Sequence, residues 1–440
     1  MTEAKAKLIP PTLILPFILV TSLFALWGFA NDITNPMVAA FKNILLISNF
    51  ESSLVQFAFY GGYCVMAIPA ALFIKKFSYK SGILVGLGLY SIGCLLFIPS
   101  GWLMAFDAFL FAYFIMTCGL SFLETSSNPY ILAMGDEATA TRRLNFAQSF
   151  NPMGSLTGML VARNLILCKL DPMTEDARRE LLKTAPEAFT KIAKHDLSVI
   201  IGPYAVLGLV VALFFVVFFV MRLPRSTHDD NRDLSVRATL GRLVKNANYI
   251  EGVIAQAFYV GVQIMCWTFI IQYAEAEMGL SKAQGQFYNM IAMGMFVCSR
   301  FICTFLLKYV NSGALLAILA TLGTALVIGV ILLPGLPGLY CLVAVSATMS
   351  LMFPTIYGIA LDGIGDDAKL GAAGLIMAIG GGCLMPPMQA WIMDQPAFNL
   401  GFMTLSSVRT SFTLPMICFI VVASYGLKTY LRSRKGGSAC

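Results

Sequence analysis

The apolar residues of this chain lie in twelve long runs separated by short polar segments. A run of about 20 apolar residues is long enough to cross the hydrocarbon core of a bilayer as an α-helix. Because 58% of the 440 residues are hydrophobic and only 12% are charged, lipid must face most of this apolar surface. We therefore predict twelve spans, at residues 12–40, 52–76, 80–100, 104–134, 143–167, 197–222, 248–274, 283–308, 312–334, 336–361, 369–393 and 405–431.

Two longer polar segments interrupt the spans. Residues 168–196 carry charges of both signs, which predicts a short amphipathic helix outside the membrane, and residues 223–247 form a basic linker. The linker divides the spans six and six. The predicted organisation is an N-terminal six-helix bundle at 1–222, a cytoplasmic linker at 223–247 and a C-terminal six-helix bundle at 248–440.

The positive charges indicate the orientation of the spans. With the N-terminus inside, twenty of the thirty Lys and Arg residues lie on the cytoplasmic side, as the positive-inside rule requires. We expect a multi-pass protein of the bacterial inner membrane with both termini in the cytoplasm. The same placement, in short clusters between apolar runs, argues against nucleic acid as the partner despite the net charge of +7.

Short sequence matches between the two halves predict an internal repeat. Ser81-Gly82 follows the second span and Ser312-Gly313 follows the eighth, while Asn128-Pro129 and Phe353-Pro354 lie in the fourth and tenth spans. Their offsets are close to half the chain length. We expect an all-α membrane protein with two pseudo-symmetric halves that bind a substrate near the midplane.

The residue types that usually hold metals or cofactors are scattered. The eleven cysteines stand singly without a CxxC pair, and the two histidines lie in polar loops. We predict no metal and no cofactor, and no nucleophile–base constellation indicates a membrane-embedded enzyme.

The first span carries a group of polar residues. A charged side chain in hydrocarbon costs about 2.5–3.5 kcal/mol on insertion scales and usually faces a polar cavity. Asn31, Asp32 and Asn35 lie here, and Asp32 and Asn35 share a helix face because they are three residues apart. Pro36 removes a backbone donor and can bend the helix. A position at the membrane interface is the alternative, although the apolar sequence continues beyond it.

The fourth and fifth spans carry further polar groups. Glu124 and Asn128 lie four residues apart on one face of the fourth span, whose core offers no Lys or Arg as a structural partner for the carboxylate. Asn145, Gln148 and Asn151 form a ladder in the fifth span. Such amides can bond neighbouring helices, but three on one stripe favour the wall of a hydrophilic cavity.

The seventh span has a face of amides and aromatic rings. Gln256, Tyr259, Gln263 and Trp267 recur at helical spacing. Amides can bond sugar hydroxyls and a ring can cover the apolar face of a pyranose. An aromatic stripe at this spacing can also be ordinary packing.

Together these segments resemble the fucose:proton symporters, a branch of the major facilitator superfamily that includes glucose/galactose and N-acetylglucosamine carriers. The resemblance covers nearly the whole chain. Its most specific motifs are Lys75-Lys76-Phe77-Ser78-Tyr79-Lys80-Ser81-Gly82, Leu123-Glu124-Thr125 with Asn128-Pro129, Arg143-Leu144-Asn145 with Ala147-Gln148 and Phe150-Asn151, and Tyr259-Val260-Gly261 with Gln263, Cys266 and Trp267.

The resemblance implies roles for several residues. It places Glu124 in the sugar and proton site, and Gln148 and Asn151 in the wall of the sugar cavity. L-fucose symporters of this family carry Ala-Asn-Asn-Leu-Asn-Asp in the first span, where the last Asp carries the proton. Asn35 stands at that position here, and Asp32 lies one turn earlier on the same face. A proton-coupling role for Asp32 is therefore an inference from helix geometry.

The predicted function is import of a monosaccharide, L-fucose first and galactose or glucose next, by proton symport through alternating access. Asp32 and Glu124 would couple the protons. The predicted sugar-binding residues are Asn31, Asn35, Glu124, Asn128, Gln148, Asn151, Gln256, Tyr259, Gln263 and Trp267. The alternatives are a carrier of N-acetylglucosamine or another sugar, a drug/proton antiporter, and a sugar receptor that does not transport. The partners expected are the sugar, protons and the lipid bilayer, with the monomer as the working unit.

Overall fold

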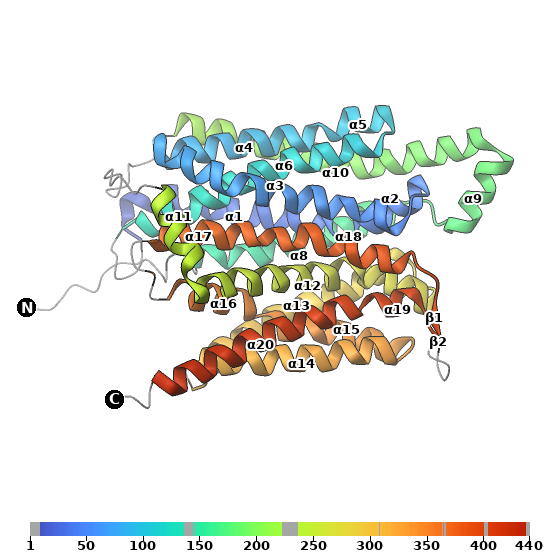
Figure 1. The fold of residues 1–440 in the computed structure, drawn as a ribbon. Coiled ribbons are helices and arrows are strands. Elements are labelled where there is room, and N and C mark those ends of the chain that lie inside the picture. The colour runs from blue at the N-terminus through green and yellow to red at the C-terminus, as the bar shows by residue number, and fades with distance from the viewer. Residues whose placement is uncertain are drawn as a thin grey trace, which may run out of the picture. The chain divides into compact units, whose positions relative to one another are not determined.

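A computed structural model describes residues 9–135, 143, 146–221, 236–307, 309–362, 364, 367–399 and 404–436. The chain consists of long helices joined by short connections (Figure 1). As far as Val220 the elements are η1 (Pro11–Leu13), α1 (Ile14–Thr34), α2 (Met37–Leu45), α3 (Asn49–Lys76), α4 (Tyr79–Leu95), α5 (Phe97–Leu103), α6 (Phe106–Ala133), α8 (Phe150–Val161), the π-helix η3 (Ala162–Leu167), α9 (Glu175–Thr184) and α10 (Pro186–Val220).

The rest of the described chain is also helical, apart from one short β-hairpin. Two-residue strands pair antiparallel, Phe398 opposite Leu405. The elements are α11 (Val236–Lys245), α12 (Ala247–Met278), α13 (Lys282–Leu306), α14 (Ser312–Leu332), α15 (Leu336–Met349), α16 (Met352–Leu361), α17 (Ala368–Met377), η5 (Ala378–Gly380), α18 (Gly381–Met393), β1 (Phe398–Asn399), β2 (Thr404–Leu405), α19 (Ser407–Ser411) and α20 (Thr413–Gly436).

Most of the predicted spans appear as helices that could cross a bilayer. Within the described residues, ten helical stretches are long and apolar enough to do so. The two remaining predicted spans coincide with α8 followed by η3 and with α13. Large apolar side chains such as Leu213, Phe219 and Phe301 are exposed, as expected for a surface that faces lipid.

Two span boundaries differ from the prediction. The first span is not one continuous helix: α1 ends at Thr34, a turn follows, and α2 begins at Met37 directly after Pro36. Proline lacks the N–H that a continuous helix needs here. The sixth span was predicted to begin at residue 197, but α10 begins at Pro186. Proline is well tolerated in the first helical turn, so the helix extends from the polar segment into the span.

The described chain divides into two compact units. Unit 1 contains Met1–Thr34, Val65–Lys169 and Lys194–Leu234, and unit 2 contains Asn35–Cys64, Leu170–Ala193 and Ser235–Cys440. The first boundary falls at the break between α1 and α2. The predicted bundles at 1–222 and 248–440 are divided at the linker instead, and this division stays a prediction.

Close helix packing in unit 1 depends on glycines. A Cβ atom on Gly154 of α8 would lie 1.9 Å from the backbone oxygen of Ala25 in α1, and one on Gly28 would lie 2.2 Å from the oxygen of Asn151. The backbones of α1 and α8 can approach this closely only because these positions lack a side chain. This contact fixes where the polar residues of α1 and α8 lie within unit 1.

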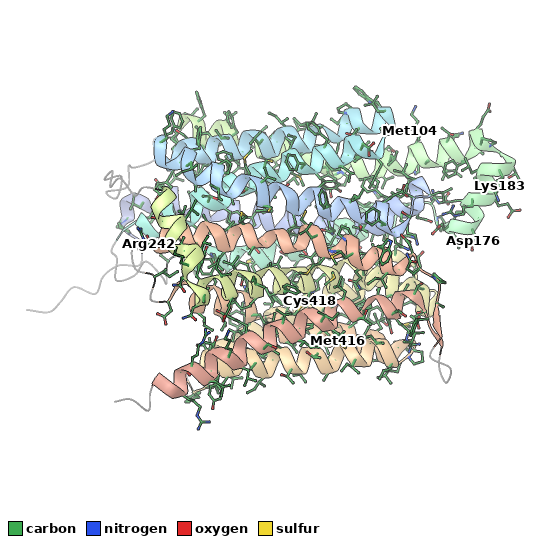
Figure 2. The ribbon with its side chains drawn as sticks, viewed as in Figure 1. Met104, Asp176, Lys183, Arg242, Met416 and Cys418 are labelled. Carbon is green, nitrogen blue, oxygen red and sulfur yellow. The ribbon has the colours of Figure 1, made fainter. Side chains whose placement is uncertain are left out.

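Charged residues mark the two ends of unit 2. Asp176 and Lys183 lie on α9 at one end, and Arg242 lies on α11 at the other (Figure 2). The amphipathic helix predicted within 168–196 is thus present as α9. Arg242 bonds both carboxylate oxygens of Asp367, at 2.6 and 2.7 Å. The hydrogen bonds from Arg242 lower the pKa of Asp367.

Candidate functional site

Glu124 lies in α6, and two amides of unit 1 form a short chain of hydrogen bonds to its backbone oxygen. The side chain of Asn128, one turn further on, donates to the backbone oxygen of Glu124 at 3.0 Å. Gln148 lies just before α8 and donates to the side-chain oxygen of Asn128 at 3.2 Å. Among the described residues we find no hydrogen bond or ion pair to the Glu124 carboxylate. The carboxylate therefore remains available to a proton or a ligand.

Asn151 sits at the contact between α8 and α1. Its side-chain nitrogen donates to the backbone oxygen of Phe24 at 3.3 Å. Gln148, by contrast, is exposed, and its one hydrogen bond among the described residues goes to the partly exposed Asn128. The two amides predicted for one cavity wall thus differ: Asn151 also holds two helices together. Asn145, the third member of the predicted ladder, lies outside the described residues.

Asp32 lies near the end of α1 and is 1% exposed, whereas Asn31 is half-buried. Both side chains have interactions within the protein. Two residues further along the helix, the hydroxyl of Thr34 lies 3.2 Å from that of Tyr204, which lies 2.9 Å from that of Tyr113. Sequence analysis missed this buried chain of hydroxyls. Its members come from α1, α6 and α10, and no spacing pattern within one helix links them.

Asn35, the residue at the family's aspartate position, belongs to unit 2. Its side-chain oxygen accepts a hydrogen bond from Gln56 of α3 at 3.1 Å. The same Gln56 nitrogen donates to the hydroxyl of Thr268 in α12 at 3.0 Å. Gln56 is completely buried. Sequence analysis did not select Gln56 or Thr268, although a glutamine inside an apolar span was a signal that could have marked the first of them.

The predicted face of α12 is divided between packing and unsatisfied polar groups. The hydroxyl of Tyr259 donates to the backbone oxygen of Met349, and the indole of Trp267 donates to Ser346, both at 3.0 Å on α15. The aromatic pair is thus bonded within unit 2. Gln256 is completely buried, and neither side-chain atom has a partner in the described part of the chain. Gln263 is half-buried. A buried amide without partners is costly, so Gln256 is suited to a polar ligand.

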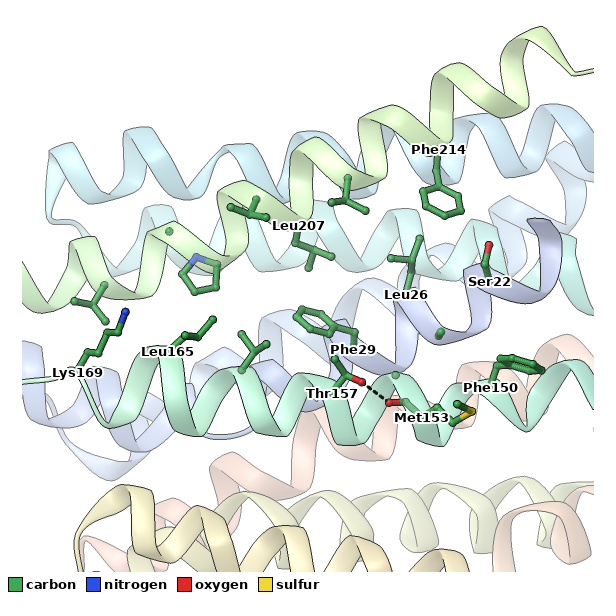
Figure 3. Close-up of a pocket in the computed structure, with 18 of the residues that line it drawn as sticks. Ser22, Leu26, Phe29, Phe150, Met153, Thr157, Leu165, Lys169, Leu207 and Phe214 are labelled. Atoms are coloured by element: carbon green, nitrogen blue, oxygen red, sulfur yellow. Dashed lines mark hydrogen bonds between the residues drawn. The ribbon is translucent and has the colours of Figure 1, made fainter. Parts of the chain in front are cut away.

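A large cavity in unit 1 has a different character. It measures about 900 Å³ and lies between α1, α8 and α10 (Figure 3). Its walls are apolar except for Ser22, Thr157, Ser198 and Lys169, and each of the three hydroxyls donates to a backbone oxygen of its own helix. None of the predicted sugar-binding residues lines it. An apolar wall of this kind suits hydrocarbon better than a sugar.

The described residues contain no group of three or more His, Cys, Asp or Glu side chains that could hold a metal ion. The polar groups instead form two sets. Asn31, Asp32, Glu124, Asn128, Gln148 and Asn151 lie in unit 1, and Asn35, Gln256, Tyr259, Gln263 and Trp267 lie in unit 2. Amides and carboxyl groups inside long apolar helices are typical of a membrane transport protein.

The comparisons identify the family. The model of the Major Facilitator Superfamily matches residues 19–378, and the chain belongs to this superfamily. It is 54% identical to the L-fucose-proton symporter of Haemophilus influenzae, over 97% of this chain and 99% of the relative. It is 33% identical to the L-fucose-proton symporter of Escherichia coli, over 93% of this chain and 92% of the relative.

A solved structure agrees with these relatives. The crystal structure of the Major Facilitator Superfamily transporter FucP in the outward conformation matches with a TM-score of 0.71 and 32% identity, over 94% of this chain and 99% of that chain. The predicted fold class and family resemblance are confirmed. The relatives are transporters, which agrees with the prediction that the chain is not an enzyme.

Proposed function

We propose that this chain imports L-fucose together with protons by alternating access. The observation that carries the proposal is the carboxylate of Glu124, which lies within an apolar span one helical turn before Asn128 and has no partner among the described residues. The name of the Haemophilus influenzae relative, at 54% identity, supports L-fucose as the sugar.

In this proposal, Glu124 and Asp32 both couple protons to transport, but in different ways. A protonated Glu124 donates a hydrogen bond to a sugar hydroxyl, and it releases its proton when the site opens to the cytoplasm. Asp32 is buried in α1 and has partners inside the protein, so its protonation acts through those contacts. Asn35 cannot carry a proton, which leaves Asp32 as the ionisable group of this polar stretch.

The groups proposed to hold the sugar are amides and aromatic rings. In this proposal, Gln148 and Asn128 form hydrogen bonds with sugar hydroxyls. Gln256 does the same, because its side-chain amide has no hydrogen-bond partner among the described residues. The full proposed set is Asn31, Asn35, Glu124, Asn128, Gln148, Asn151, Gln256, Tyr259, Gln263 and Trp267.

We place the protein in the bacterial inner membrane as a monomer with both termini in the cytoplasm. The charge asymmetry of the connections supports this orientation. Thr184 on α9 and Val244 on α11 are both exposed. A cysteine at Thr184 is expected to react with an impermeant maleimide only from outside, and one at Val244 only from inside. Labelling of both from one side would contradict the orientation.

An uptake panel in proteoliposomes tests the function. Fucose, galactose, glucose and N-acetylglucosamine are supplied with and without an imposed pH gradient. We expect accumulation of fucose only with the gradient. If only another sugar is taken up with the gradient, that sugar and not fucose is the substrate. Binding without uptake would indicate a receptor. Export of apolar cations and no sugar uptake would indicate a drug/proton antiporter.

A further inference from the structure

The end of α18 is attached to the start of α3 through one carboxylate. Asp394 follows α18, and its Oδ1 accepts hydrogen bonds from the backbone nitrogen of Asn49 at 3.1 Å and from its side-chain nitrogen at 2.6 Å. Its Oδ2 accepts from the backbone nitrogen of Phe50 at 2.8 Å. The first backbone N–H groups of a helix lack partners within the helix and favour a negative charge. All of these residues belong to unit 2.

A second contact lies deeper along α3. Gln56 is seven residues beyond Asn49, about 10 Å along the helix at 1.5 Å per residue. Its amide nitrogen bridges Asn35 and Thr268, at 3.1 and 3.0 Å. Gln56 and Asn35 are both buried, so this contact lies inside the protein and not at its surface.

A third contact joins the middle of α3 to η5 and to the start of α18. A Cβ atom on Gly382 would lie 3.0 Å from the ring of Tyr60, and one on Gly380 would lie 2.9 Å from the sulfur of Cys64. Only glycine allows α3 to approach η5 and α18 this closely. The three contacts are therefore spread along α3 from its start to its middle.

We propose that these three contacts form the outer gate of the transporter and that Asp394 is its latch. The proposal rests on the proposed transport function and orientation, which place the start of α3 and the end of α18 outside. Residues 35–64 belong to the predicted N-terminal bundle and residues 248–440 to the C-terminal one. Any movement that admits sugar from outside between these segments must break the bonds to Asp394 and Gln56.

The native Cys383 is a reporter for the gate. It is buried in α18, and its sulfur lies within 3.7 Å of the Cβ position of Gly61 in α3. In a protein whose other cysteines are replaced, an impermeant maleimide added to right-side-out vesicles reaches Cys383 only when the outer gate opens. Asp394→Ala is expected to raise the labelling rate at least tenfold, equivalent to about 1.4 kcal/mol. Asn49→Ala, which removes one of the three bonds, should raise it less.

The control is Asp107→Ala, at an exposed aspartate in the first turn of α6. It removes a carboxylate near another helix start and should leave Cys383 labelling unchanged. An unchanged rate in both Asp394→Ala and Asn49→Ala would overturn the latch. An equal increase in Asp107→Ala would also overturn it, because the effect would then be general. Since this assay uses no sugar, its result is independent of the uptake panel.

A covalent lock gives a second test. In a cysteine-free protein, the pair Asn49→Cys and Asp394→Cys is expected to form a disulfide under oxidation. Transport should then stop and should return on reduction, because the outer gate stays closed. Full transport by the oxidised, cross-linked protein would contradict the gate. So would a failure of the pair to cross-link.

Discussion

Replacing Glu124 with Gln tests the proton site with little change in shape. The backbone oxygen of residue 124 still accepts the bond from Asn128, and the described chain offers the lost carboxylate no partner. Removing the charge also relieves its desolvation in the span. We therefore expect the free energy of unfolding to change by no more than about 1 kcal/mol.

The effect on transport should be large. One charge moved across 100 mV is worth about 2.3 kcal/mol, which corresponds to about 50-fold sugar accumulation for one proton per sugar. Glu124→Gln cannot release a proton, so the accumulation ratio should fall to about 1. Loss of the sugar contact should also weaken binding by about 1–3 kcal/mol, or about 5- to 150-fold.

The assay is pH-driven uptake beside counterflow in the same proteoliposomes, with sugar binding measured on purified protein. A correctly folded Glu124→Gln protein should fail in both transport modes. Wild-type accumulation by this variant would refute the proposed role of Glu124. Gln148→Ala is a useful companion, because it changes a neighbouring exposed amide and should weaken binding while gradient-driven accumulation persists.

Three further predictions concern coupling, packing and the linker. Asp32→Asn should abolish gradient-driven accumulation but keep sugar exchange; accumulation against a gradient would assign Asp32 a structural role. Gly154→Ala should destabilise the protein by about 1–3 kcal/mol in thermal unfolding, whereas Gly202→Ala, which meets nothing within 4 Å, should be tolerated. At any pH above the usual aspartate pKa of about 3.9, the Arg242–Asp367 bond should hold α11 in place at full strength. This contribution to the stability of α11 should be lost as the pH falls through the lowered pKa of Asp367. Protease cleavage of α11 should then increase at low pH, and Arg242→Ala should remove this pH dependence.

The sequence predicted the spans because their physics is local. Long apolar runs, a proline at residue 36 and four-residue spacing were enough to predict the helices, the disturbance in the first span and the shared face of Glu124 and Asn128. Local patterns also predicted α9. They misplaced the start of α10, because a polar sequence beginning with Pro186 can extend a helix without being apolar.

Only the tertiary structure decided which neighbour meets each helix face. Helical periodicity placed Tyr259 and Trp267 on one side of α12, but packing determined that α15 meets them. The same holds for the bond from Gln56 to Asn35 and for Asp394 at the start of α3. A sequence pattern fixes the angle of a side chain around its own helix. The partner across the interface depends on how distant segments pack, and no spacing within one helix encodes that.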